Sequence, residues 1–177
     1  MGFRKDLRHL MQELKQLTEK QKDADTLLRE RIELFEKEAG YRLPADYRQF
    51  LLDGGNKDYS VNTFDVYADD DDDRLLYSFM VQKYLKLNPG EKDDILYNLL
   101  KLRNELPSGD LLPIAFDRFR NIMMISLVSG RVYFWDYYNR VDDENDPALE
   151  EPPDRLYYVA PSFGDFHERL YRHKRFH

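Results

Sequence analysis

Apolar residues near the start of the chain recur at the spacing of one helix face. Between residues 3 and 17 they lie four, three, four and three positions apart, which predicts an amphipathic helix. A stripe of about two heptads either packs on the protein's own core or forms a coiled-coil seam with a partner, and its short length favours the core. The residues of the stripe are Phe3, Leu7, Leu10, Leu14 and Leu17.

Two further helices follow and are joined by a tight hinge. Residues 26–39 have a helical apolar pattern, and Gly40 lies where a helix commonly ends on a left-handed residue. Pro44 suits the first turn of the next helix, Asp46 complements the dipole of that helix, and Gly54 ends it. The apolar residues expected inside are Leu28, Ile32, Phe35, Tyr47, Phe50 and Leu51.

The middle of the chain combines one predicted strand with two predicted helices. Residues 61–68 alternate and are rich in β-forming residues, which predicts a strand. A second element of this region is predicted to begin as a helix at Asn88, with Pro89 at its first position and Glu91 as a capping residue. Residues 74–87 before it are also predicted to be helical, with core positions at Leu76, Phe79, Met80 and Leu87.

The last third of the chain is predicted to form strands and one closing helix. The pair Ser129-Gly130 lies between two apolar runs and predicts a hairpin turn. Ser162, with Asp165 three residues later, predicts the start of the final helix. The four predicted strands are residues 111–117, 121–129, 131–138 and 156–160.

The order of these elements predicts the fold class. Helices, then an antiparallel meander, then a closing helix are typical of an α+β fold, here with a sheet of about four to six strands packed by helices. We divide the chain into an N-terminal helical extension, residues 1–25, and a single domain, residues 26–177. With 42 % apolar residues among 177, the chain can bury a core of its own.

The net charge of −7 is unevenly distributed along the chain. Residues 65–73 carry six acidic residues, residues 142–154 carry seven, and neither segment contains a basic residue. These segments hold 13 of the 34 acidic residues, so the rest of the chain has a net charge of +6. Nucleic acids bind through basic groups that neutralise phosphates, so we expect no nucleic-acid partner.

Neither a catalytic nor a metal site is evident in the sequence. Aspartates of residues 69–73 match the first ligand positions of an EF-hand loop, but Arg74 replaces the required glycine. His173 and His177 have the spacing of two zinc ligands without the further ligands of a complete site. There is no serine elbow and no phosphate-binding glycine loop. We therefore predict a protein that is not an enzyme and has no catalytic residues, metal or cofactor.

The chain also lacks signals for export or for a membrane. It contains no cysteine, which fits a reducing compartment. No apolar run approaches the roughly 18 residues of a membrane span, and the first residues mix charges in a way untypical of a secretory signal. We predict a cytoplasmic protein without a membrane partner and leave the oligomeric state open.

Four segments of the chain together form a specific pattern. In their order and spacing they resemble the SUKH superfamily, which includes fungal killer-toxin-resistance and cell-wall regulators and many bacterial immunity proteins. The resemblance covers residues 27–171, and one departure is the RFRN turn at 118–121, where relatives often carry glycines before the position of Asn121. The segments are IELFEKEAGYRLPADYRQFLLDGGN (32–56), LLPIAFD (111–117), ISLVSGRVYFWD (125–136) and VAPSFGDFHERL (159–170).

The resemblance implies a non-catalytic α+β domain that acts by binding. A bacterial member of this kind looks like an immunity protein, which binds and neutralises a cognate toxin, often a nuclease. The alternative is an intracellular interaction or regulatory module without a toxin partner. In both cases the function would lie on a surface that fits one partner.

The two acidic segments are the candidate for that surface. A nuclease presents basic residues to phosphates, so an anionic face complements it, and neighbouring tyrosines would supply buried anchors. The alternative is that both segments only solubilise the protein, since charge runs often form solvated faces. The candidate residues are Tyr67, Asp69, Asp70, Asp71, Asp72, Asp73, Tyr137, Tyr138, Asp142, Asp143 and Glu144.

Overall fold

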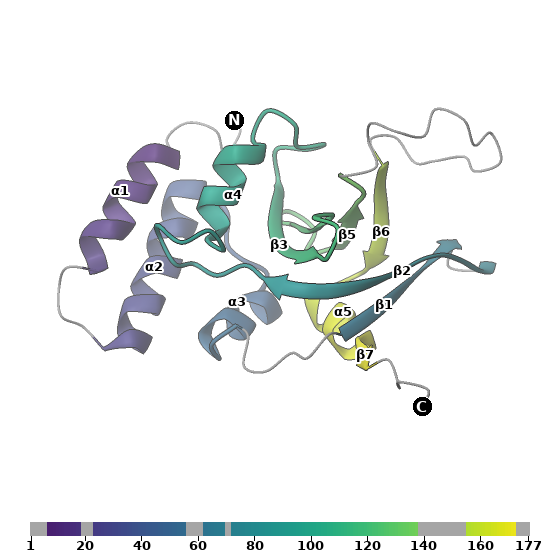
Figure 1. The fold of residues 1–177 in the computed structure, drawn as a ribbon. Coiled ribbons are helices and arrows are strands. Elements are labelled where there is room, and N and C mark those ends of the chain that lie inside the picture. The colour runs from purple at the N-terminus through teal and green to yellow at the C-terminus, as the bar shows by residue number, and fades with distance from the viewer. Residues whose placement is uncertain (1–6, 19–22, 56–61, 70–71, 138–154, 173–177) are drawn as a thin grey trace.

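The described residues form an α+β fold in which helices gather beside one antiparallel sheet of seven strands (Figure 1). The computed structural model describes residues 7–18, 23–55, 62–69, 72–137 and 155–172. The helices are α1 (Leu7–Thr18), α2 (Ala24–Ala39), α3 (Ala45–Leu52), α4 (Ile95–Leu102) and α5 (Phe163–Arg169). The strands are β1 (Asn62–Asp69), β2 (Asp72–Tyr84), β3 (Leu111–Asp117), β4 (Ile122–Ser126), β5 (Val132–Trp135), β6 (Leu156–Ala160) and β7 (Tyr171–Arg172). Their order across the sheet is β6-β5-β4-β3-β2-β1-β7.

Helix α1 packs on the protein's own core. Leu7, Leu10 and Leu14 are buried in the main hydrophobic cluster, Leu14 completely. The helix lies against α2 and also contacts α4. The short apolar stripe therefore contacts the core of its own chain, whereas the division of the chain at residue 25 stays a prediction.

The hinge between α2 and α3 has the predicted form. Asp23 caps α2, because its Oδ1 accepts a hydrogen bond of 2.9 Å from the amide of Thr26. Gly40 ends α2 with φ of 71°, a left-handed conformation that glycine adopts without steric cost. Pro44 precedes the first residue of α3, one position before its predicted place.

The central strands have an apolar residue on each face of the sheet. All five residues of β4 are buried. Met123 and Ile125 belong to the main cluster, while Ile122 and Met124 belong to a second cluster around Trp135. Because successive side chains in a strand point to opposite faces, the sheet has an inner face toward the helices and an outer face centred on Trp135.

The helix predicted for residues 74–87 is wrong. Most of this segment is strand β2, which pairs along its first part with β1 and along its last part with β3. The apolar residues of the segment fit either period, and its Tyr, Phe and Val residues favour strands. Pairing with the adjoining strand β1 and with the more distant strand β3 satisfies the backbone and decides the conformation, and this cannot be read from local spacing.

The helix predicted to begin at Asn88 begins instead at Ile95. Asp94 is its N-cap, and the Asp94 Oδ2 accepts a hydrogen bond of 3.0 Å from the amide of Tyr97. The turn before this helix is hydrogen-bonded to the end of the preceding strand. The amide of Lys86 donates to Asp93 O, and Lys86 O accepts from the amide of Ile95. These backbone bonds use the residues that a helix starting at Asn88 would need.

The sheet is strongly curved. Helix α5 and a few flanking residues, 161–170 in all, connect β6 at one edge with β7 at the other. In a flat sheet those edges would lie about 29 Å apart, six spacings of about 4.8 Å. A seven-residue helix and three extended residues span about 20 Å at most. The edges must therefore approach each other, and β1 does lie near β6.

Candidate functional site

Two of the four segments that carry the family resemblance, residues 32–56 and 159–170, meet in a buried seam between α3 and α5. Asp46, in the first turn of α3, accepts a hydrogen bond of 2.7 Å through Oδ2 from the amide of Gly164 in α5. The ring of Tyr47 lies 5.0 Å from the ring of Phe163. The Leu-Pro-x-Asp-Tyr and Ser-Phe motifs therefore hold two helices together.

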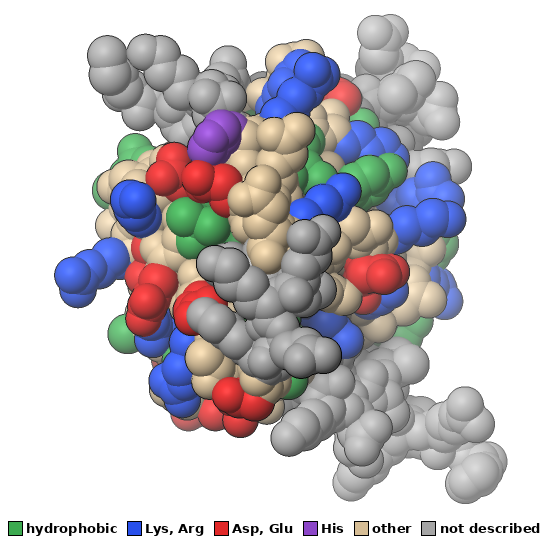
Figure 2. Space-filling model, turned by 90° about the vertical axis from the view of Figure 1, so that its left-hand side faces the viewer, with side chains coloured by type: hydrophobic (Ala, Val, Ile, Leu, Met, Phe, Trp, Pro, Cys, Tyr) green, Lys and Arg blue, Asp and Glu red, His purple; other side chains and the backbone are tan. Residues whose placement is uncertain are grey.

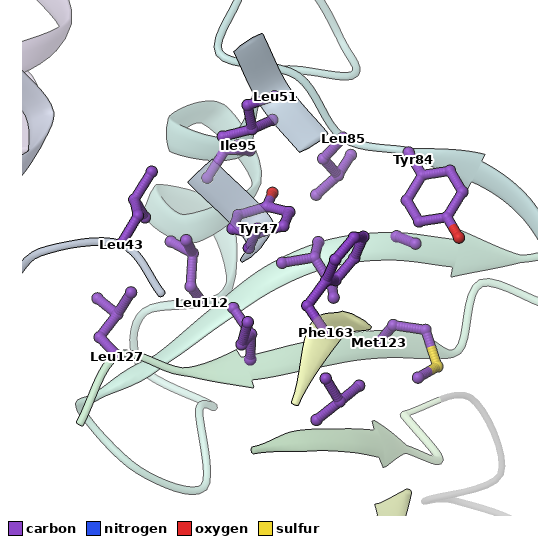
Figure 3. Close-up of a cluster of buried hydrophobic side chains, with 14 of the residues drawn as sticks. Leu43, Tyr47, Leu51, Tyr84, Leu85, Ile95, Leu112, Met123, Leu127 and Phe163 are labelled. Carbon is purple, nitrogen blue, oxygen red and sulfur yellow. The ribbon is translucent and has the colours of Figure 1, made fainter. Parts of the chain in front are cut away.

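Aromatic residues fill this seam and extend it to the sheet (Figure 3). Phe163 contacts Phe50 at 4.7 Å between ring centroids, and Phe50 contacts Tyr84 of β2 at 4.9 Å. Tyr47 is fully buried, and burial raises the pKa of its phenol far above the ordinary value. A neutral hydroxyl sealed from solvent cannot act as an acid or base on a substrate. The seam, defined by Asp46, Tyr47, Phe50, Phe163 and Gly164, is structural.

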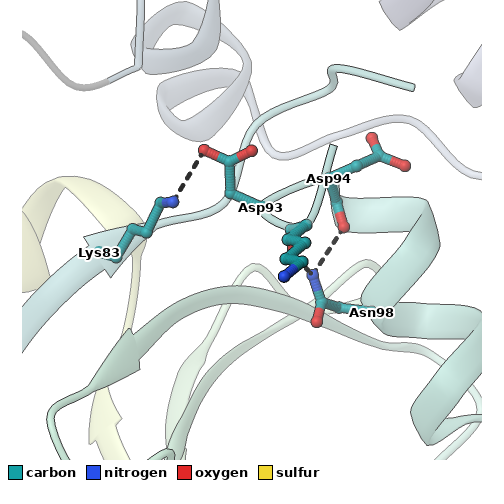
Figure 4. A network of polar contacts seen from close by, with 5 residues as sticks. Lys83, Asp93, Asp94 and Asn98 are labelled. Atoms are coloured by element: carbon teal, nitrogen blue, oxygen red, sulfur yellow. Dashed lines mark hydrogen bonds and ion pairs between the residues drawn. The ribbon is translucent and has the colours of Figure 1, made fainter. Parts of the chain in front are cut away.

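A second buried polar group joins α2 to α4 (Figure 4). Asp94 has no solvent exposure, and its carboxylate accepts hydrogen bonds from the amides of Asn88 and Tyr97. Burial raises the pKa of Asp94 to about 6, opposed by these hydrogen bonds and by the Arg31 guanidinium. Arg31 of α2 donates to Leu87 O at 3.3 Å.

The neighbours of Asp94 complete this joint. The side-chain amide Nδ2 of Asn98 donates to the backbone oxygen of Asp94 at 2.8 Å. The Nζ of Lys83 forms an ion pair with Asp93 Oδ2 at 3.2 Å. Each of these contacts holds the turn before α4 in place. The raised pKa of Asp94 is therefore explained by its role in packing and does not indicate a catalytic carboxylate.

The described residues contain no group of three or more His, Cys, Asp or Glu side chains that could hold a metal ion. Among the helices of the described part of the chain, none has the length and apolar character needed to cross a bilayer.

The first candidate segment lies at the tip of a long hairpin. Asp69 and Asp72 are partners in the register of β1 and β2, and Tyr67 is paired with Leu75. Asp73 follows in β2. Asp70 and Asp71, which join the two strands, are outside the described residues, as are Tyr138, Asp142, Asp143 and Glu144 of the second segment.

This hairpin, which we call the arm (residues 62–69 and 72–81), extends beyond the body of the sheet. Val81 of β2 is paired with Asp117, the last residue of β3. The nine residue-to-residue steps from Val81 back to Asp72 span about 30 Å at the rise of a strand. Figure 1 shows the arm projecting past β5 and β6. Its acidic tip therefore stands away from the helices.

The β1–β2 hairpin and the connection from β5 to β6, whose sequences contain the two acidic segments, leave the sheet at the same end. Successive strands from β1 to β6 are antiparallel, so every second connection leaves from the same end. The arm tip, the β3–β4 turn and the connection between Tyr137 and Arg155 share that end, which we call the acidic end. The amide of Asp136 donates to Arg155 O at 3.1 Å and joins the described residues on either side of that connection.

Tyr137 is partly committed to the outer face of the sheet. Its ring lies 4.9 Å from the ring of Trp135, and its hydroxyl donates to Glu105 Oε2 at 3.1 Å. The side chain is half-buried, so only part of its surface faces solvent.

The acidic end contains an exposed aromatic residue that sequence reasoning missed. Phe119 in the β3–β4 turn is 53 % exposed, and the guanidinium of Arg118 lies 4.4 Å from its ring centroid. The hairpin forms although Arg120 occupies the left-handed position, with φ of 71°, where relatives often carry glycine. The RFRN departure from the family pattern was the one signal that marked this turn.

The face over α1 and α2 differs from the acidic end. Figure 2 shows basic and acidic side chains interspersed on it, with small apolar areas between them. Neither sign of charge dominates there, so this face offers no extended charged surface.

Comparison with known proteins gives one finding. No curated protein and no solved structure matches the chain. The model of the SMI1 / KNR4 family (SUKH-1) matches residues 27–169, which are most of the chain. With its α+β fold and with two of the family motifs meeting in one seam, the chain belongs to the SMI1 / KNR4 family (SUKH-1).

Proposed function

We propose that this chain is a non-catalytic immunity protein, which binds a cognate bacterial toxin and neutralises it by covering its active or substrate-binding surface. Membership of the SUKH-1 family is consistent with an immunity or regulatory role, and the family is generally non-catalytic. The use of the motif residues for packing supports the same view. Asp46 accepts a hydrogen bond from α5, and the ring of Tyr47 in α3 packs against the ring of Phe163 in α5.

One observation carries the proposal. The antiparallel order of the strands makes the β1–β2 hairpin and the β5–β6 connection, whose sequences contain 13 acidic residues, leave the sheet at the same end. A toxin that acts on nucleic acid needs basic residues to bind phosphates, so a dense anionic surface competes for the same groove. The charges speed the encounter and select the partner, while aromatic anchors supply affinity. The proposed anchors are Tyr67, in the first acidic segment, and Tyr137 and Tyr138, shortly before the second.

The proposed partner also defines the expected place of action. A toxin that cleaves nucleic acid acts inside the cell, so its inhibitor would act in the cytoplasm. No metal, cofactor or membrane enters this mechanism.

Co-expression with the neighbouring open reading frame, the expected source of the toxin, tests the proposal. Cells that express the toxin alone should stop growing, and co-expression of this chain should restore growth and yield a stable complex on purification. A variant with Phe163→Ala, which removes a core contact, provides a destabilised control for the assay. Continued growth arrest together with the absence of a complex would refute the immunity role and leave a regulatory role without a toxin partner.

A further inference from the structure

The β3–β4 turn, residues 118–121, is held rigidly at the acidic end. Asp117 Oδ1 accepts hydrogen bonds from the amides of Phe119, at 2.7 Å, and Asn121, at 2.8 Å. Asp117 Oδ2 accepts a third, of 2.9 Å, from the Asn121 side-chain amide. Both Asp117 and Asn121 are buried. The backbone that carries Phe119 is thus fixed before any partner arrives, which lowers the entropy lost on binding.

The turn presents an unusual set of side chains for a solvent-exposed position. A phenylalanine that is 53 % exposed is flanked by two exposed arginines, one of which lies over its ring. Arg120 holds a left-handed conformation that is unfavourable for any residue with a Cβ and that glycine would adopt freely. Packing requires neither the phenyl ring nor the two guanidinium groups, because all three residues are exposed and none belongs to the buried clusters.

The position of the turn relates it to the arm. Val81 is the β2 residue paired with Asp117, so the arm continues past the turn and stands beside it. The charge therefore changes along this end of the molecule, from Arg118 and Arg120 at the base to the aspartates at the tip. A nucleic acid presents negative charge throughout and does not match this order. A folded protein can present carboxylates near one point and basic residues further along.

We propose that Phe119, with Arg118 and Arg120, is an apolar anchor that inserts into an acid-bordered recess of the partner, while the arm tip contacts the partner's basic surface. This inference rests on the proposed function, since the partner is the same toxin. Phenylalanine and arginine at a rigid, exposed turn have the chemistry of residues that dominate binding energy, because burial of the ring and pairing of the guanidinium groups occur together.

The test measures binding of the purified, catalytically inactivated toxin domain from the neighbouring gene to the full chain. Phe119→Ala should raise the dissociation constant by about tenfold or more without changing the melting temperature. The matched control is Tyr97→Ala, which removes an aromatic side chain of similar exposure, 44 %, from α4 beyond the opposite end of β3. The control variant should bind like the unmodified protein.

A second variant separates binding from stability. Arg120→Gly relieves the left-handed conformation, so it should raise the melting temperature while weakening toxin binding. Normal binding by both Phe119→Ala and Arg120→Gly would overturn the inference and leave the proposed function standing. Failure of the unmodified protein to bind the toxin domain would overturn both. A short DNA duplex should not bind, and duplex binding that is lost in both variants would also overturn the inference.

Discussion

The seam between α3 and α5 and the acidic end of the sheet use similar residues for opposite purposes. Both contain aspartates and aromatic rings, but in the seam Asp46 and Phe163 are committed to partners within the chain. At the acidic end Phe119 faces solvent, and the strand register places Asp69 and Asp72 at the tip of a projecting arm. The family motif thus specifies the scaffold, and the surface that we propose for partner binding lies outside it.

The largest expected difference between the two regions is in stability. Phe163→Ala removes a buried ring that contacts Tyr47 and Phe50, and should lower the free energy of unfolding by about 3–5 kcal/mol. The same truncation at Phe119 should change it by about 0.5 kcal/mol or less, because the ring is exposed. Urea denaturation of the two variants measures both values. Equal losses would show that the turn is part of the core.

The next effect concerns the buried joint at Asp94. Folding raises the pKa of this carboxyl to about 6, so between about pH 4 and pH 6 the folded state binds its proton more tightly than the unfolded state. The contribution of Asp94 to stability is therefore present below this window and is lost as the pH rises through it. This loss lowers the free energy of unfolding by about 2 kcal/mol.

Asp94→Asn isolates this contribution. Asparagine keeps an oxygen that can cap α4 but cannot titrate in this range. The difference in unfolding free energy between the variant and the unmodified protein should change by that amount between pH 4 and pH 7, because the other carboxyl groups cancel. A difference that does not change with pH would contradict the assignment.

A smaller loss is expected from the link between α3 and α5. Asp46→Ala removes the acceptor for the amides of Gly164 and Tyr47 and should cost about 1–2 kcal/mol of unfolding free energy. Asp25→Ala is the matched control, because Asp25 also lies in the first turn of a helix but is exposed. It should cost about 0.5 kcal/mol, the size of a helix-dipole interaction. Equal costs in thermal unfolding would show that the link to α5 contributes nothing.

Local signals predicted the elements whose ends are set by local chemistry. Gly40 ends α2, and Ser162 caps α5 by accepting from the amide of Asp165 at 3.1 Å. The strands at 111–117 and 156–160 have their predicted bounds.

Pairing between distant segments produced the errors. Strand β2 looked helical because its apolar residues fit either period, and its pairing with β1 and with the distant β3 decides the conformation. Strand β7 was missed because two residues have no pattern of their own. That the two acidic segments belong to connections at the same end of the sheet followed only from the observed strand order. Phe119 was missed because exposure depends on the packed structure, which residue type alone does not report.

The central claim is that this protein acts by presenting its acidic end to a basic partner. The most direct test is the association rate of the toxin domain, measured against salt concentration for the unmodified protein and for a variant with Asp69 to Asp73 replaced by Asn. The unmodified protein should associate rapidly at low salt and slow steeply as salt is added, because screening weakens the attraction. The variant should associate slowly and show a much flatter dependence on salt. Identical rates and identical salt dependence for the two proteins would contradict the claim.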